Sequence, residues 1–253
     1  MKKNKPEAAI GLFETMRSFN GKIVYLDEHL KRIFSAAKLM RMQNLSSAVN
    51  LKKLIQDTVK SNKIKDSYLK LVFLKNKRKT DISVLAKKYH PFNAKKYKEG
   101  FRVRISSFWK DESHPFAGLK TTDRLIYELS FQEARAKGFD EALLLNCERS
   151  LAEGSRSNIF FVKDKILFTP SLKCGCLNGI TRKVVFDLAQ KYKIRTKEGI
   201  FSVGDLLDAD EAFFTNSLMG IMPVGMVEHN KIGKGANKIT KFLMEKYQRL
   251  LCQ

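Results

Sequence analysis

The sequence predicts an α+β protein of two domains. Segments typical of β-strands occur in groups with amphipathic helical segments between the groups, which differs from the strict alternation of a doubly wound parallel sheet. The stretch between Trp109 and Gly118 is polar and contains a proline, so it is the best candidate for a linker between domains. We therefore expect a smaller N-terminal α/β domain at residues 1–108, a linker at 109–118 and a larger C-terminal domain at 119–253.

The N-terminal domain is expected to begin with a hairpin. Residues 9–17 have the pattern of a strand, Asn20-Gly21 favours the positive φ angles of a tight turn, and residues 22–25 return as the partner strand. Asp27 can cap the helix that follows, and a second helix is expected at 48–60. The apolar faces expected for these helices comprise Leu30, Ile33, Phe34, Ala37 and Met40, and then Val49, Leu54, Ile55 and Val59. Further strands are expected at 68–74, 82–86 and 101–106.

The C-terminal domain is expected to open with a helix at 122–137 that ends at Gly138. A strand at 140–146 and a hairpin of 158–162 with 165–169 follow. Thr181 opens another helix, and a strand at 211–215 and a polar turn precede the last one. The apolar residues expected on these last two helices are Val184, Val185 and Leu188, and then Ile239, Phe242, Leu243 and Leu250.

The strongly basic composition raises the alternative of a non-enzymatic module that binds nucleic acid. The net charge is +22, but the lysines are spread along the whole chain, and the cluster Lys75-Asn76-Lys77-Arg78-Lys79 lacks the interleaved aromatic residues of a single-strand binder. We therefore expect a solvated lysine-rich surface and no nucleic-acid partner. No apolar run approaches the roughly 20 residues of a membrane span, and the basic N-terminus has no apolar segment behind it, so we expect a cytoplasmic protein with no membrane partner.

The cysteines do not form a recognisable framework. Cys147, Cys174, Cys176 and Cys252 are too few and too irregularly spaced for a set of disulfides in a chain of 253 residues. Cys174-Gly175-Cys176 resembles half of a metal site, but no second Cys or His pair at suitable spacing completes it. We expect no metal.

Three segments of the second half are candidates for chemistry, and each also has an ordinary structural interpretation. Lys120 lies where the linker meets a helix, so both domains can enclose it and make its amine reactive; it can equally be a surface lysine. Glu153 follows a strand and can pair with a cofactor ring nitrogen, or it can be a turn carboxylate in water. Ile180 and Thr181 begin a helix. The free amides at its N-terminus can bind phosphate, or the segment can be the start of an ordinary capped helix.

Taken together and in order, these segments resemble the class IV aminotransferase family, the pyridoxal 5'-phosphate (PLP) enzymes of fold type IV. The resemblance covers nearly the whole chain. It is carried by Gly11-Leu12-Phe13-Glu14-Thr15, Asp27-Glu28-His29-Leu30-Lys31-Arg32, Leu119-Lys120, Glu153-Gly154-Ser155-Arg156-Ser157-Asn158, Thr169-Pro170, Gly179-Ile180-Thr181-Arg182 and Met222-Pro223-Val224. It implies a two-domain α+β fold similar to that of D-amino acid aminotransferase, with PLP as the cofactor.

The resemblance also implies roles for single residues. Lys120 carries the cofactor covalently and moves protons, while Glu153 bonds the pyridine nitrogen and keeps it protonated, which sustains the electron sink. Arg32 grips the phosphate, although its position opposite Leu30 and Phe34 would by itself predict a solvated side chain. The remaining phosphate contacts are expected from the amides of Ile180 and Thr181 and from Ser217, and Asn216 is expected to be a further cofactor-binding residue.

The family contains branched-chain and D-amino acid aminotransferases and also 4-amino-4-deoxychorismate lyases, and local features resemble the lyases. The segment Asn216-Ser217-Leu218-Met219 has the lyase pattern, and Arg124 stands where branched-chain enzymes place a tyrosine. These features predict formation of 4-aminobenzoate and pyruvate from 4-amino-4-deoxychorismate, a step of folate biosynthesis. An aminotransferase acting on D- or branched-chain amino acids is the alternative, because the fold permits both reactions.

Departures from the lyase pattern affect the substrate side. Asp123 replaces an asparagine, and a glycine-rich stretch is shortened to residues 76–81. Arg17 and Arg124 are candidates for a substrate carboxylate, since guanidinium and carboxylate match in a two-point fork; either can equally lie on the surface. By the same resemblance we expect a homodimer with its site at the domain boundary.

Overall fold

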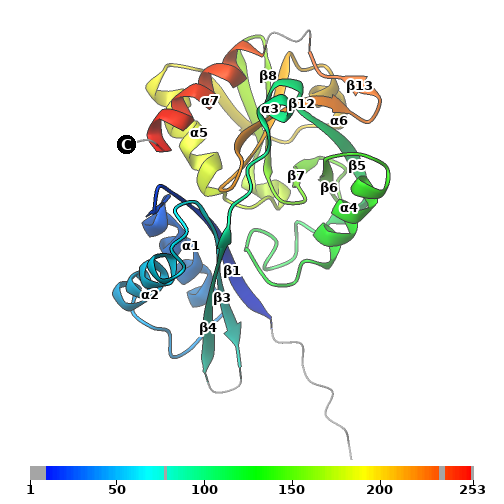
Figure 1. Ribbon diagram of the computed structural model, residues 1–253. Coiled ribbons are helices and arrows are strands. Elements are labelled where there is room, and N and C mark those ends of the chain that lie inside the picture. Colours follow the sequence, from blue (N-terminus) through cyan, green and yellow to red (C-terminus); the bar gives the residue numbers. More distant parts are fainter. Residues whose placement is uncertain (1–9, 77–78, 234–236, 252–253) are drawn as a thin grey trace, which may run out of the picture. The chain divides into compact units, whose positions relative to one another are not determined.

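The computed structural model describes residues 10–76, 79–233 and 237–251. These residues form two compact units, which are described separately (Figure 1). Unit 1 contains residues up to His90 together with Leu119–Asp123, and unit 2 contains Pro91–Gly118 and Arg124 onward. The expected strand start at residue 9, the basic N-terminal residues, Lys77-Arg78 and Cys252 lie outside the described residues.

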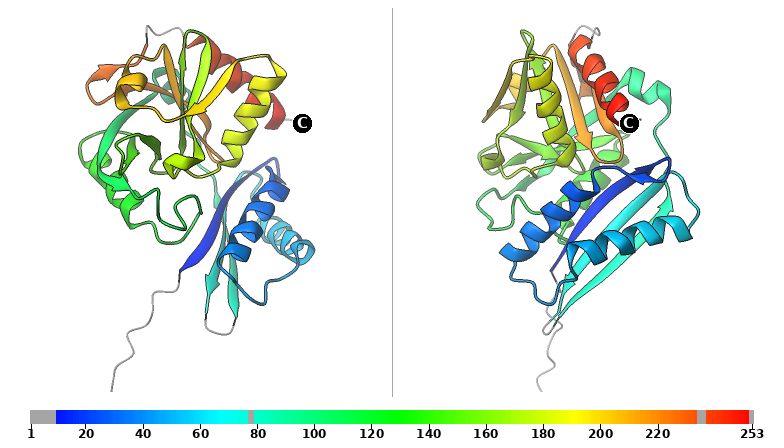
Figure 2. Two further views of the ribbon diagram at one scale, coloured as in Figure 1. Left: turned by 180° about the vertical axis from the view of Figure 1, so that it is seen from behind. Right: turned by 90° about the vertical axis from the view of Figure 1, so that its left-hand side faces the viewer.

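Unit 1 is a four-stranded antiparallel sheet with two helices on one of its faces (Figure 2). Its elements are β1 (Gly11–Phe19), β2 (Lys22–Ile23), α1 (Leu26–Leu39), α2 (Ala48–Ser61), β3 (Ser67–Lys75) and β4 (Thr80–Lys88), and the strand order is β2-β1-β3-β4. Alternate residues of β3 are buried, as expected for a sheet that packs on one side, whereas in β1 the first four residues are all buried and the alternation begins at Glu14. The buried apolar residues of these two strands include Leu12, Met16, Leu69, Leu71 and Phe73.

The expected hairpin is confirmed, with Asn20 and Gly21 both at positive φ between β1 and β2. Two expectations for the helices are wrong. The N-cap of α1 is Tyr25 in the left-handed conformation and makes no side-chain capping bond, so Asp27 is a first-turn residue near the positive end of the helix dipole. In α2, Val49 and Leu54 are exposed, because the buried face follows the four-residue spacing of Leu51, Ile55 and Val59.

Residues 119–123 belong to unit 1 because they pair with the N-terminal half of β1. Leu12 and Thr121 form an antiparallel bridge, and the Phe13 amide donates to the Lys120 carbonyl at 2.9 Å. Thr122 forms two hydrogen bonds with Gly11. Its amide donates to the Gly11 carbonyl and its hydroxyl accepts from the Gly11 amide, each at 2.8 Å. The backbone of Lys120 is therefore fixed beside β1.

Unit 2 is built on a nine-stranded, strongly curved mixed sheet. Its elements are α3 (Ala94–Glu99), β5 (Phe101–Lys110), α4 (Leu125–Ala136), β6 (Glu141–Asn146), β7 (Leu151–Gly154), β8 (Asn158–Lys163), β9 (Ile166–Pro170), the 3-10 helix η1 (Leu172–Cys174), α5 (Ile180–Lys191), β10 (Thr196–Gly199), α6 (Val203–Leu207), β11 (Glu211–Asn216), β12 (Gly220–Val227), β13 (Asn230–Lys231) and α7 (Lys238–Leu251). The strand order is β10-β9-β8-β11-β12-β5-β6-β7, with β13 on β12.

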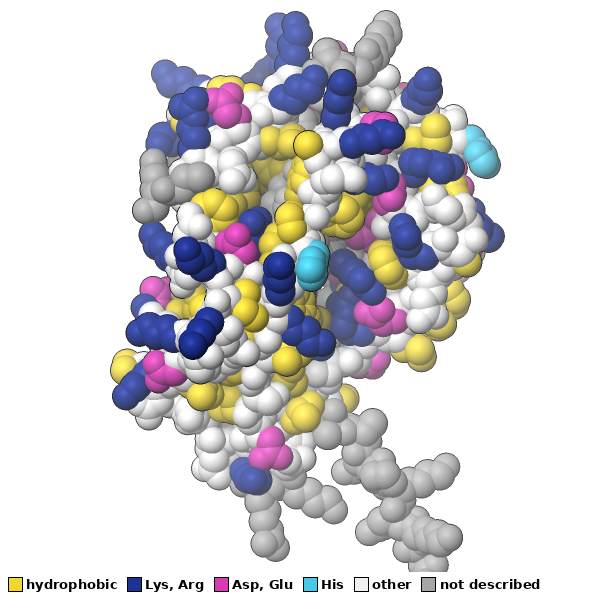
Figure 3. Space-filling model, in the orientation of Figure 1, with side chains coloured by type: hydrophobic (Ala, Val, Ile, Leu, Met, Phe, Trp, Pro, Cys, Tyr) yellow, Lys and Arg dark blue, Asp and Glu magenta, His cyan; other side chains and the backbone are white. Residues whose placement is uncertain are grey.

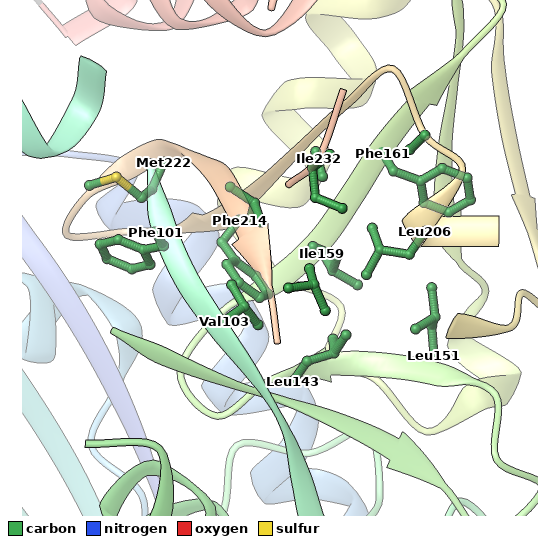
Figure 4. Packing of buried hydrophobic residues seen from close by; sticks show 14 of the residues in the cluster. Phe101, Val103, Leu143, Leu151, Ile159, Phe161, Leu206, Phe214, Met222 and Ile232 are labelled. Atoms are coloured by element: carbon green, nitrogen blue, oxygen red, sulfur yellow. The ribbon is translucent and has the colours of Figure 1, made fainter. Parts of the chain in front are cut away.

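The core of unit 2 lies inside the curve of this sheet (Figure 4). Phe160 stacks on Phe213 of the neighbouring strand at 5.2 Å between ring centroids. Helices α5 and α7 pack together through the edge-to-face pair Tyr192 and Phe242, and α4 packs on β5 and β6. The apolar residues shown in Figure 4 include Phe101, Val103, Leu143, Leu151, Ile159, Phe161, Leu206, Phe214, Met222 and Ile232.

The division into units differs from the expected domains at both ends of the linker. The sequence places β5 in the N-terminal domain, but this strand pairs in parallel with β12 on one side and β6 on the other, so it is an interior strand of unit 2. The expected helix at 122–137 begins only at Leu125, because the residues before Arg124 extend along β1. The sequence patterns do not predict the strands β7 and β12.

Charged side chains of both signs lie on the face of the molecule that Figure 3 shows. In Figure 3, Lys and Arg side chains are scattered over the visible face of each unit, with Asp and Glu between them. None of the helices formed by the described residues is long and apolar enough to cross a bilayer. Within the described part of the chain, the group close enough to share a metal ion is Asp111, Glu112 and Cys147, rather than the Cys174-Gly175-Cys176 segment.

Candidate active site

Glu153 lies on β7, and its carboxylate is buried with 5% of the residue exposed. Oε1 accepts from the Lys110 ammonium and from the Tyr127 hydroxyl, the latter at 2.9 Å. Oε2 accepts from the Leu177 amide at 2.9 Å. The sequence interpretation of Glu153 as a turn residue in water is therefore wrong, since the carboxylate is enclosed and held from three directions.

The neighbours of Glu153 are a cation and two neutral groups. Lys110 is 6% exposed and supplies the positive charge. Burial and then the charge of Glu153 raise the pKa of Tyr127 far above its usual range, so Tyr127 stays a neutral hydrogen-bond donor. Burial and the same carboxylate raise the pKa of Cys176 to about 12, so its thiol stays protonated. Negative charge in this cluster is thus confined to Glu153.

A helix N-terminus lies next to this cluster along the chain. α5 begins at Ile180 after the N-cap residue Gly179, and its first turn contains no acidic side chain. The first amides of a helix have no intrahelical partner and attract anions. The buried hydroxyls that have no hydrogen-bond partner among the described residues include that of Thr181 on α5 and that of Thr215 on β11, the strand that α5 contacts. These donors fit a phosphate group.

The segment 177–179 connects Glu153 to the start of α5. The Leu177 amide donates to Glu153, while its carbonyl accepts from Asn158 Nδ2 at 2.8 Å and from the Gly179 amide at 2.9 Å. A Cβ added to Gly179 would lie 2.1 Å from Asn158 Oδ1, so only glycine fits against this side chain. The carboxylate and the helix N-terminus are therefore held by one hydrogen-bonded segment.

Asn216 ends β11 and fixes the turn that leads into β12. Its Oδ1 accepts from the amides of Leu218 and Met219 at 3.0 and 2.9 Å, and its Nδ2 donates to the Arg156 carbonyl at 3.1 Å. The side chain is thus occupied by backbone groups, and Ser217 lies inside the turn that it stabilises. A structural role for Asn216 is observed, whereas its expected contact with the cofactor stays a prediction.

Unit 1 contains a second buried charge cluster, on β1 and α1. Glu14 is 1% exposed; it accepts from Arg32 Nε at 2.7 Å and from Arg32 Nη2 at 2.5 Å, and His29 Nδ1 lies 2.7 Å from Oε2. Burial raises the pKa of Glu14, but the charge and hydrogen bonds of Arg32 and His29 lower it more, to about 2. Burial lowers the pKa of His29. The helical pattern alone predicted a solvated Arg32, and this is wrong.

Lys120 and Arg17 lie elsewhere in unit 1. The ammonium of Lys120 lies 4.6 Å from the centre of the Phe13 ring. The guanidinium of Arg17 lies 4.3 Å from the centre of the Tyr89 ring, and its Nε is buried without an acceptor among the described residues. Such a flat cation with an unmatched donor fits a carboxylate.

The comparison with known families identifies the family of this chain. The profile of the family described as amino-transferase class IV matches residues 11–227, which include both clusters, Lys120 and the start of α5. The chain belongs to the class IV aminotransferase family. Enzymes of this family depend on PLP, and the donors around Glu153 and at α5 fit that cofactor.

Similar proteins within the class IV aminotransferase family include enzymes with different names. A branched-chain-amino-acid aminotransferase of Pseudomonas aeruginosa is 29% identical over 94% of this chain and 83% of its own length. The structure of a branched-chain aminotransferase of the thermophilic archaeon Thermoproteus uzoniensis, solved with norvaline, has a TM-score of 0.87 at 31% identity, covering 96% of this chain and 85% of that chain. A candidate 4-amino-4-deoxychorismate lyase of Legionella pneumophila has a TM-score of 0.89 at 23% identity, covering 98% and 96%, which shows a shared fold.

Within the class IV fold, the structure brings together some of the expected site residues. In unit 2, Glu153, Ile180 and Thr181 are linked through segment 177–179. Arg124 donates to the Ser155 carbonyl at 2.7 Å and stacks on Tyr127, so part of its guanidinium is occupied.

Sequence reasoning gave no individual role to four residues of the two clusters: the buried Glu14, His29 and Lys110, and the half-buried Tyr127. A usable signal existed for Glu14, because a carboxylate at a buried position of an alternating strand requires a partner. Lys110 offered no comparable signal, since it is one of 48 Lys and Arg residues.

Proposed function

We propose that the chain is a PLP-dependent aminotransferase that transfers the amino group of an amino acid, of the branched-chain or D- class, to a 2-oxo acid. The observation that carries this proposal is its similarity over 94% of the chain to a curated branched-chain-amino-acid aminotransferase. The buried acceptor at Glu153 and the donors at the start of α5 support the cofactor part of the proposal.

Each residue has a defined task in this proposal. Lys120 holds the cofactor covalently and, once released, carries the proton of the substrate carbon that bears nitrogen. Glu153 accepts a hydrogen bond from the pyridine nitrogen. The amides of Ile180 and Thr181, with Ser217 and the guanidinium of Arg32, hold the phosphate. Bound PLP supplies an electron sink for the substrate carbon that bears the amino group.

Phosphate binding by Arg32 is compatible with its pairing to Glu14. That pairing uses Nε and Nη2 on one edge of the guanidinium, and a guanidinium has five N–H donors. The Glu14 contact therefore takes up one edge of the guanidinium and orients the group. In this proposal Glu14 is the residue that positions Arg32.

A second candidate is the elimination of pyruvate from 4-amino-4-deoxychorismate. Two sequence resemblances support it: the segment Asn216-Ser217-Leu218-Met219 resembles the lyase pattern, and Arg124 stands where branched-chain enzymes place a tyrosine. Here Lys120 takes the proton from the ring carbon bearing nitrogen, and the bond from the ring to the enolpyruvyl oxygen breaks. The ring becomes aromatic as 4-aminobenzoate, and the released enol becomes pyruvate.

One pair of assays separates the two reactions. With L-leucine or D-alanine and 2-oxoglutarate, an aminotransferase forms glutamate and the 2-oxo acid of the donor in equal amounts. With 4-amino-4-deoxychorismate alone, a lyase releases equal amounts of 4-aminobenzoate and pyruvate over many turnovers, because no second substrate is needed. Release of 4-aminobenzoate without amino transfer overturns the first proposal in favour of the second. Failure of both assays with PLP-loaded protein overturns both.

A homodimer and a cytoplasmic location are part of the same proposal, by resemblance to the family. Sedimentation velocity of the PLP-loaded protein tests the first. Cell fractionation with an antibody against the chain tests the second. A monomer that retains full activity would contradict the expected dimer.

A further inference from the structure

Lys110 is a buried lysine with no role in the reaction described above. It ends β5, and its side chain is 7% exposed. Its ammonium contacts the Tyr127 hydroxyl and Glu153 Oε1, and the Tyr127 hydroxyl in turn donates to the same oxygen at 2.9 Å. We propose that Lys110 is a positioning residue that keeps Glu153 ionised and directed at the pyridine nitrogen of PLP. This inference rests on the proposed role of Glu153.

The sheet register places the two side chains on the same face. Lys110 pairs with Asn146 of β6, and Glu153 pairs with Leu144 of the same strand. Asn146 and Leu144 are two residues apart, so they and their partners point to the same side of the sheet. That side is the one on which α4 packs, and α4 supplies Tyr127. The contact between Lys110 and Glu153 therefore follows from backbone pairing, with β6 between the two strands.

The positive charge of Lys110 bears on whether the Glu153 carboxyl group accepts or donates a hydrogen bond. A carboxyl group that is 5% exposed and has only neutral neighbours favours its protonated form, which donates a hydrogen bond instead of accepting one. Within the described cluster the cation in contact with Glu153 is Lys110. An ammonium in direct contact favours the ionised carboxylate, and it therefore favours a proton on any nitrogen base that shares a hydrogen bond with Glu153.

The arrangement of donors leaves one acceptor direction open. Oε1 already accepts from Lys110 and Tyr127, while Oε2 accepts from the Leu177 amide. Since each carboxylate oxygen can accept two hydrogen bonds, Oε2 retains one lone pair. Lys110 and Tyr127 together fix the rotation of the carboxylate, so this lone pair has a defined direction. It is the position from which Glu153 accepts from a protonated pyridine nitrogen.

The protonation state of bound PLP tests this inference directly. The wild type, Lys110→Met, Lys110→Arg and Glu153→Gln are loaded with PLP carrying ¹⁵N in the pyridine ring, and the ¹⁵N chemical shift is measured. We expect the shift of protonated pyridine in the wild type and in Lys110→Arg, which keeps the charge. We expect a displacement toward neutral pyridine in Lys110→Met and in Glu153→Gln, with turnover reduced about 10²-fold.

The matched control is Lys96→Met. Lys96 pairs with Asp140 at 3.0 Å in the same unit, and its removal tests the loss of an ion pair as such. We expect its ¹⁵N shift to equal that of the wild type. A displaced shift in this control would show that the probe reports general loosening and would overturn the assignment to Lys110.

The outcomes separate this inference from the one on which it rests. An unchanged ¹⁵N shift in Lys110→Met, with a displaced shift in Glu153→Gln, overturns the role of Lys110 and leaves that of Glu153. An unchanged shift in Glu153→Gln overturns the role of Glu153 itself. Removing one partner of a buried ion pair can prevent folding, so Lys110→Gln, which keeps a hydrogen-bond donor without the charge, is measured as well. A protonated pyridine in Lys110→Gln would also overturn the inference.

Discussion

The Arg32 guanidinium forms two parallel hydrogen bonds with the buried carboxylate of Glu14, at 2.7 Å from Nε to Oε1 and 2.5 Å from Nη2 to Oε2. This two-point contact fixes the plane of the guanidinium as well as its position. Because α1 carries Arg32 and β1 carries Glu14, the contact also ties the helix to the sheet. A residue proposed to bind phosphate is thereby held in place by a buried side chain of β1.

Glu14→Gln should weaken PLP binding. Glutamine has the same size but can accept only one of the two bonds, so Arg32 loses its fixed orientation. We expect the dissociation constant for PLP to rise about tenfold, the size of one charge-assisted hydrogen bond. Titration of the apoprotein with PLP measures this constant. Glu28→Gln, on the exposed face of the same helix, serves as the control and should leave it unchanged.

Acid should destabilise unit 1 in two stages. The pKa of Glu14 falls from 4.5 to about 2 on folding, so its contribution of about 3 kcal/mol is present above pH 4.5 and is lost as the pH falls toward 2. The pKa of His29 is also lowered, so stability begins to fall below about pH 6.5, where the unfolded chain binds the proton first. Hydrogen exchange of β1 and α1 amides as a function of pH measures both stages. Protection that stays constant from neutral pH down to about pH 3 would contradict this assignment.

Borohydride reduction should attach the phosphopyridoxyl group to Lys120. The ammonium of Lys120 lies 4.6 Å from the centre of the Phe13 ring, and the ammonium of Lys70 lies 5.1 Å from the same centre. Lys70 is therefore a suitable comparison for Lys120. Peptide mapping should find the label on Lys120 in the wild type and in Lys70→Ala, and no label in Lys120→Ala. Turnover of Lys120→Ala should fall by about 10²–10⁴-fold, the usual effect of a positioned acid or base. A label on Lys70 would transfer the cofactor role to that residue.

Arg17→Leu should raise KM for the substrate more than it lowers kcat. The guanidinium is held against Tyr89 with its Nε buried, which leaves it oriented for a substrate carboxylate. We expect an increase in KM of about tenfold to a hundredfold. Arg102→Leu removes another arginine that lies over an aromatic ring, at 5.4 Å from the centre of Phe139, and should leave KM unaltered. Equal effects of the two substitutions would rule out a specific role for Arg17.

Gly179→Ala should reduce both stability and PLP affinity. The added Cβ would lie 2.1 Å from Asn158 Oδ1, and Asn158 is held by the Leu177 carbonyl, so the start of α5 must move. We expect a loss of about 1–3 kcal/mol, as for other overpacked sites, together with weaker binding of phosphate. Gly204→Ala, whose Cβ would lie 3.5 Å from its nearest neighbour, Ser202 Oγ, is the control. Phosphate binding equal to wild type in Gly179→Ala would argue against α5 as the phosphate site.

Much of the fold could be predicted from the sequence because its signals are local. The Asn20-Gly21 turn and the alternating strands depend on neighbouring residues and were placed correctly. The same holds for the helix that begins at Ile180. The family resemblance then identified the cofactor, which no local pattern indicated.

Predictions failed where distant parts of the chain determine the structure. Nothing in residues 101–110 indicates that this strand pairs with β12, more than a hundred residues later, so the domain boundary was misplaced. In α2, the apolar residues Val49 and Leu54 suggested a face that tertiary packing does not use. The burial of Lys110 depends on Glu153, a partner 43 residues away, and a lysine in a lysine-rich chain gives no local indication of such a partner.

The parallel pairing of β5 with β12 has a consequence for synthesis on the ribosome. β5 leaves the ribosome early, but its neighbour β12 spans Gly220–Val227, so one edge of β5 has no partner until almost the whole chain has been made. β1 likewise receives the segment 119–123 only after β5 has emerged. Exposed strand edges invite pairing with other chains. The nascent protein therefore exposes unpaired strand edges for most of its synthesis, although both edges are covered in the final structure.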